Sequence, residues 1–74
     1  MSNDRINDLK RRARDAELEV IEKPDGHFIV IGGLVNAHYW PNSKRLTAWA
    51  EGAPRGRHHM TPKQVVQLAN KGEA

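Results

Sequence analysis

Both tryptophans and the only tyrosine of this chain lie close together, between His38 and Trp49. The segment is typical of a β-hairpin, because two strand-like runs flank a Pro-Asn-Ser turn. Since strand side chains alternate between faces, His38, Trp40 and Trp49 are expected on one face. With Lys44 and Arg45 nearby, two indoles suit stacking or cation–π contact with a nucleobase or a partner protein. The alternative is that one or both tryptophans are core, because large aromatic side chains are highly buried on average.

A second basic stretch, residues 54–59, contains Arg55 and Arg57, whose guanidinium groups suit phosphate or carboxylate. The competing interpretation is an exposed connector. The formal net charge of +3 is uneven, with six bases and seven acids in residues 1–37 but six bases and two acids in residues 38–74. An acid-poor half attracts polyanions, although a similar charge is common in small domains with other roles.

The four histidines invite a metal or catalytic interpretation; they are His27, His38, His58 and His59. Without cysteine, and without histidines at helical ligand spacing, we expect no metal site and no cofactor. A serine triad is not expected either, because Ser43 has no orienting carboxylate nearby. His27 is the more serious candidate, since it follows a Pro-Asp-Gly turn at the start of a strand.

The length of 74 residues indicates one domain, residues 1–74, with little room for a deep substrate pocket. The absence of cysteine fits a reducing compartment. The apolar runs are too short to span a membrane, and the polar N-terminus is unlike a secretory signal. We therefore expect a cytoplasmic protein without membrane partners.

Apolar spacing and turn residues predict a single order of elements. The expected elements are a helix over about 3–17, strands over 18–22, 27–31, 34–40 and 45–50, and a helix from Thr61 to about Gly72. The second and third strands could instead fuse around Gly32 and Gly33. A capping box starts the last helix.

Each helix is apolar on one side only, so both are expected to cover the same face of an antiparallel sheet. The predicted fold class is α+β in αβββα order, with three or four strands and the other sheet face open. The expected core is Leu18, Val20, Phe28, Val30, Leu46, Val66 and Leu68, closed by Ile6, Leu9 and Ala13.

The stretch Asp25-Gly26-His27 resembles the Gly-Ser-His stretch of HicA-type messenger-RNA interferases, which are small domains related to the double-stranded-RNA-binding fold. The resemblance implies a ribonuclease with His27 as general acid or base. The serine, the histidine-rich segment and the Gly-Thr opening of the last helix are missing here, so only His27 carries over.

A broader resemblance, over most of residues 17–71, is to small phage and prophage proteins. It rests on Gly26-His27-Phe28, Tyr39-Trp40-Pro41, the run from Lys44 to Trp49, and Arg55-Gly56-Arg57. The resemblance implies an accessory protein that acts in the host cytoplasm, without a particular activity.

These observations favour a non-enzymatic module that binds a host protein or RNA or DNA, with the ribonuclease as the alternative. The expected binding residues are His38, Trp40, Lys44, Arg45, Trp49, Arg55 and Arg57. The oligomeric state does not follow from the sequence.

Overall fold

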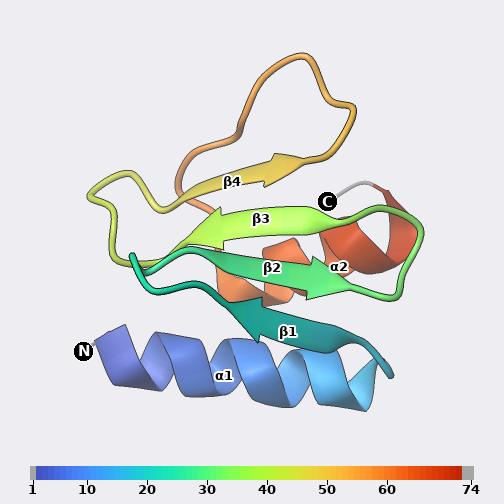
Figure 1. The fold of residues 1–74 in the computed structure, drawn as a ribbon, viewed down its shortest axis with the longest axis horizontal. Helices are drawn as coiled ribbons and strands as arrows, with labels where there is room; N and C mark the ends of the chain where they lie inside the picture. Colours follow the sequence, from blue (N-terminus) through green and yellow to red (C-terminus); the bar gives the residue numbers. More distant parts are fainter. Residues whose placement is uncertain (1, 73–74) are drawn as a thin grey trace.

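The computed structural model describes residues 2–72 and has two helices and one four-stranded sheet (Figure 1). The elements are α1 (Ser2–Asp15), β1 (Glu19–Glu22), β2 (Phe28–Ile31), β3 (Ala37–Trp40), β4 (Thr47–Ala50) and α2 (Pro62–Lys71). The α+β prediction is confirmed, and the hairpin between β3 and β4 makes the sheet four-stranded. None of the helices in the described part of the chain is long and apolar enough to span a bilayer.

The strands follow one another in the order β1-β2-β3-β4, and every neighbouring pair is antiparallel. Burial alternates along β2, where Phe28 and Val30 are buried while Ile29 and Ile31 are partly exposed. The two glycines do not fuse β2 with β3, because Gly32 has a φ of +101° and turns the chain out of the sheet. Residues 32–36 therefore form a loop, and β3 begins later than the sequence predicted.

The helices lie on one side of the sheet. In Figure 1, α2 lies behind the sheet, and α1 runs alongside β1. The buried side chains of α1 and α2 join those of the strands in one core. All ten predicted core residues belong to it, with Ile6, Val20 and Leu46 only partly buried at its edge. The core also contains Val65 and Ala69, which lie on the expected apolar side of α2, and four residues that were not predicted, namely Ala37, Tyr39, Ala48 and Met60.

Residues 51–60, here called the return segment, connect β4 to α2. We expected a loop here, and the structure confirms it, with one addition: an isolated β-bridge joins the loop to the outer edge of β4. The Arg57 N–H donates to the Ala48 carbonyl at 2.6 Å, and the Ala48 N–H donates to the Arg57 carbonyl at 2.8 Å. The buried Tyr39 hydroxyl donates to the Met60 carbonyl at 2.7 Å, which fixes the end of the segment to the core.

The start of α2 has the predicted capping box. The Gln64 N–H donates to the Thr61 hydroxyl, and the Gln64 side chain accepts from the Thr61 N–H. At the other end Gly72, with a φ of +81°, donates its N–H to the Leu68 carbonyl. These caps fix the limits of the helix that covers the middle of the sheet.

Candidate functional site

The sheet face turned away from the helices, here called the open face, brings together the rings that the sequence placed on separate strands. The strand register aligns Ile21, Ile29, His38 and Trp49 in one row across all four strands. Trp40 lies next to this row, opposite Thr47 of β4. Figure 1 views the molecule from this side, with α2 behind the sheet. The predicted placement of both tryptophans opposite the helices is confirmed, and both indoles are half-buried.

Four rings pack against one another on the open face, and we call His27, His38, Trp40 and Trp49 the ring cluster. The His27 and Trp40 rings are stacked, with centroids 4.5 Å apart and planes at 7°. The His38 ring lies 5.0 Å from His27 and 5.2 Å from Trp49, centroid to centroid. The Trp49 indole N–H donates to the Ala53 carbonyl at 3.0 Å, which ties the cluster to the return segment.

A chain of hydrogen bonds runs through the cluster from Glu51 to His38 to His27. Glu51 Oε2 is 2.8 Å from His38 Nε2, and His38 Nδ1 is 2.8 Å from His27 Nε2. The His38 side chain is 14% exposed and the Glu51 side chain 47% exposed, so the chain leads from the surface into the cluster.

The geometry determines which nitrogen carries each proton when both histidines are neutral. An ionised carboxylate only accepts hydrogen bonds, so His38 donates from Nε2 to Glu51. Its Nδ1 then carries the lone pair and accepts from His27 Nε2–H. This leaves the Nδ1 lone pair of His27 as the basic end of the chain. An arrangement in which a carboxylate orients one imidazole, which in turn orients another group, is suited to proton transfer.

Two groups of this chain have shifted acidities. The hydrogen bond from His38 lowers the pKa of the Glu51 carboxyl, so Glu51 remains an anion at neutral pH. Burial lowers the pKa of His27, and the neighbouring His38 lowers it further, while Asp25 opposes the shift. Both shifts favour the neutral His27 and charged Glu51 that the hydrogen-bond assignment requires.

The predicted basic residues surround the cluster but are not part of it. Lys44 and Arg45 lie in the turn between β3 and β4, and Arg55 and Arg57 in the return segment; all four are exposed. Within residues 2–72, the side chains of Lys44, Arg45 and Arg55 have no hydrogen bond or ion pair to the rest of the protein. Figure 1 shows that these two connections lie at either end of β4.

Three open-face residues were not among the expected binding residues. His27 was considered only as a catalytic alternative, and Glu51 and His58 were not proposed. His58 Nδ1 lies 3.3 Å from the Thr47 hydroxyl, at the margin of the open face. Strand alternation could have placed Glu51 beside Trp49, because the two are separated by one residue. The sequence could not predict that His27 lies against Trp40. That prediction needs the pairing register of β2 and β3, which depends on the length of the loop between them.

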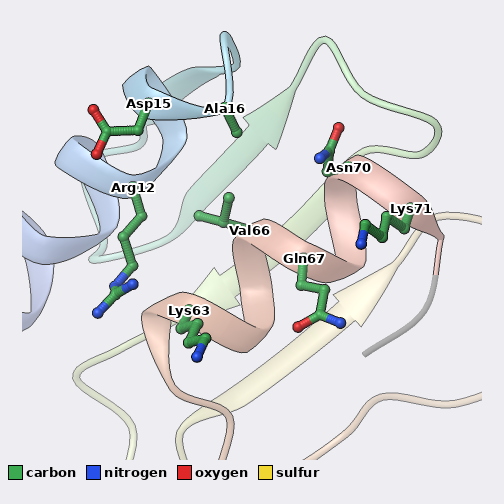
Figure 2. Close-up of a pocket in the computed structure, with 8 residues that line it drawn as sticks. All are labelled: Arg12, Asp15, Ala16, Lys63, Val66, Gln67, Asn70 and Lys71. Atoms are coloured by element: carbon green, nitrogen blue, oxygen red, sulfur yellow. The ribbon is translucent and has the colours of Figure 1, made fainter.

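The surface also has a shallow groove between the two helices, shown in Figure 2, with a volume of about 360 Å³. Its floor contains Val66, and Arg12, Lys63 and Lys71 surround it. Their charged ends spread along the rim without converging on one point (Figure 2). Across residues 2–72 there is no group of three ligating side chains arranged to hold a metal ion.

Comparison of the chain with protein families, with curated proteins and with solved structures gives no match. The assignment of a function therefore depends on the geometry of the open face.

Proposed function

We propose that this protein binds single-stranded nucleic acid on its open face. The observation that carries the proposal is the ring cluster, in which four rings from β3, β4 and the residue before β2 gather on a sheet face that α1 and α2 leave uncovered. In the setting that the sequence resemblance implies, the protein would act as a phage accessory protein on host RNA or DNA in the cytoplasm.

Unpaired nucleotides fit this face better than a duplex does. Rings on an open sheet stack with bases that are free to leave their neighbours, whereas the bases of a duplex are already stacked. Every base has a flat aromatic face, so such binding tolerates different sequences. The half-buried indoles of Trp40 and Trp49 supply surfaces of this kind.

The charges around the cluster support a polyanionic ligand. Lys44, Arg45 and Arg55 are exposed on the two connections that flank β4, and they are not engaged within residues 2–72. They are therefore available for phosphate groups without the loss of an internal ion pair. The negative charge of Glu51 repels such a ligand, but its carboxylate accepts a hydrogen bond from His38 Nε2.

The hydrogen-bond chain supports a second candidate function, the cleavage of bound RNA. The free Nδ1 of His27 is suited to accept the proton of a ribose 2′-hydroxyl as its oxygen attacks the adjacent phosphorus. The bond from phosphorus to the 5′-oxygen breaks, a solvent proton goes to the leaving oxygen, and the product is a cyclic phosphate. Glu51 and His38 would be positioning residues, because they act through His27.

One titration tests both candidates. Fluorescently labelled single-stranded RNA, single-stranded DNA and duplex DNA are titrated with the protein at low salt, and the reactions are then analysed for cleavage. We expect micromolar or tighter binding to both single strands and weaker binding to the duplex. If RNA is also cleaved and His27→Ala abolishes cleavage, the second candidate is supported.

Matched charge variants show where the strand lies. Arg55→Gln should reduce the slope of log affinity against log salt by about 0.7, because one phosphate contact on a single strand is lost. Arg14→Gln removes the same charge from the exposed side of α1, away from the open face, and should leave the slope unchanged. Equal effects would mean that binding follows total charge. If no nucleic acid is retained at micromolar protein, the proposal is wrong and a protein target becomes the better explanation.

A further inference from the structure

The two bonded histidines can accept one additional proton without losing their hydrogen bond. When both rings are neutral, His27 Nε2–H donates to His38 Nδ1, and a proton added to His27 Nδ1 leaves that bond in place. The resulting imidazolium lies against the indole of Trp40, where cation–π attraction favours it. Glu51 balances the added charge through His38.

A second proton cannot be added in the same arrangement. With both rings fully protonated, every ring nitrogen is a donor, so His27 Nε2–H and His38 Nδ1–H would point at each other. The two nitrogens are only 2.8 Å apart, and both rings would be positively charged. The contact must then break, and His27 is the ring free to move, because His38 remains bonded to Glu51 and packed against Trp49.

The other charged groups near this pair are few and lie at its margins. Lys23 and Asp25 are on the turn that leads into β2, and they act on His27 with opposite signs. On the return segment, His58 is bonded to Thr47. On β1, Glu19 lies one row beyond the cluster, opposite Ile31. None of these groups can replace the His27–His38 bond.

We propose that the Glu51–His38–His27 chain acts as a pH-sensitive switch, here called the proton latch. The hydrogen bond between His38 and His27 keeps the His27 ring stacked on Trp40. When the two histidines take up a second proton, this bond breaks and the His27 ring leaves Trp40. The release uncovers one face of the Trp40 indole and adds positive charge beside it. Both changes favour stacking and phosphate contact, so the open face is expected to bind single strands more tightly in acid. The consequence for affinity rests on the proposed function, whereas the latch itself does not.

The latch can be tested without a ligand by following the imidazole nitrogens and ring protons of the ¹⁵N-labelled chain by NMR from pH 8 to 4.5. We expect two separate protonation steps for the His27–His38 pair. The His27 ring protons should keep the ring-current shift from Trp40 through the first step and lose it in the second. Backbone amide spectra at each pH show whether the chain is still folded.

Two variants make the test specific. His38→Asn removes the partner, so His27 should show one protonation step and no coupled loss of the Trp40 stack. His59→Asn is the matched control, because His59 is exposed, lies outside the hydrogen-bond chain and has a φ of +58°, which asparagine tolerates. It should leave both steps of the pair unchanged. If the wild-type pair takes up both protons and His27 remains stacked on Trp40 in the folded chain, the latch is overturned.

Affinity provides the second readout. Titration with a single-stranded oligonucleotide at pH 7.5 and pH 5 should show a gain of about tenfold for the wild type and His59→Asn, and only a few-fold for His38→Asn. If NMR shows release and the affinity does not change, the link between latch and binding is wrong. If no oligonucleotide binds at either pH, the proposed function fails while the spectroscopic result still decides the latch.

Discussion

Gly33 is a position where the fold leaves no room for any side chain. A Cβ atom built on Gly33 would lie 2.3 Å from the Ala69 carbonyl oxygen and 2.8 Å from its carbon, so the obstacle is backbone. A hydrogen bond two residues further along explains this close approach, because the Val35 N–H donates to the same Ala69 carbonyl oxygen at 3.2 Å. The loop from β2 to β3 thus rests directly on the end of α2, and it sets the spacing of the strands that carry the ring cluster.

Gly33→Ala should therefore destabilise the protein by about 2 kcal/mol, since the backbone of α2 or of the loop must move to admit one methyl group. For a domain of this size, each kcal/mol lowers the melting temperature by roughly 4–8 °C. Gly52→Ala is the control, because Gly52 has a φ of +91° but free space around it. Its backbone strain should cost about 1 kcal/mol. Equal losses in thermal melts of the two variants would show that the contact with Ala69 does not limit the fold.

Among the connecting elements, the return segment is held in place by hydrogen bonds, some of which are buried and some exposed. Its end is fixed by the buried bond from Tyr39 to the Met60 carbonyl, and its middle by the exposed bond between Thr47 and His58. Tyr39 is fully buried, and its hydroxyl is satisfied only because the segment returns over the sheet. The position of Arg55 and Arg57 near β4 depends on these anchors.

Tyr39→Phe should cost about 1–2 kcal/mol, because the Met60 carbonyl is left buried without a donor. Hydrogen exchange at the Arg57 N–H should become faster, since Arg57 lies in the segment that Tyr39 anchors and its amide donates to the Ala48 carbonyl of β4. Thr47→Val removes the exposed bond and should change the stability by less than about 0.5 kcal/mol. An exchange rate at Arg57 that is the same in Tyr39→Phe and the wild type would contradict this role for Tyr39.

Strand alternation was enough to predict much of the fold and part of the site. The apolar positions of β2, such as Phe28 and Val30, and the common face of Trp40 and Trp49 follow from a period of two. The pairing register does not follow from it, because it depends on where the loop between β2 and β3 ends. For the same reason the sequence did not place His27 against Trp40. The burial of Tyr39 was also missed, since it depends on a carbonyl far along the chain.

At the scale of the whole molecule, the shifted groups predict how stability depends on pH. Because burial and His38 lower the pKa of His27, the unfolded chain takes up a proton there more readily than the folded chain does. Stability should therefore fall as the pH drops below about 6.5, the ordinary value for histidine. The carboxyl groups of Glu51 and Asp8, whose pKa values are lowered by hydrogen bonds from His38 and Arg12, should lower stability further below about pH 4.5.

At high pH, the ionisation of Tyr39 determines whether stability rises or falls. Burial raises the pKa of its hydroxyl above the ordinary value of about 10, so the unfolded chain loses this proton first. The free energy of unfolding should be highest between about pH 7 and 10 and should fall on both sides. Urea titrations across this range check the profile. In His27→Gln, the free energy of unfolding should fall less between pH 7 and 5, and the fall above pH 10 should remain. In Tyr39→Phe, the fall above pH 10 should be smaller and the fall in acid should remain, although this variant is less stable throughout. If the acid and alkaline declines persist unchanged in the respective variants, other groups cause the pH dependence. The stability data would then contradict a lowered pKa of His27 in the folded chain.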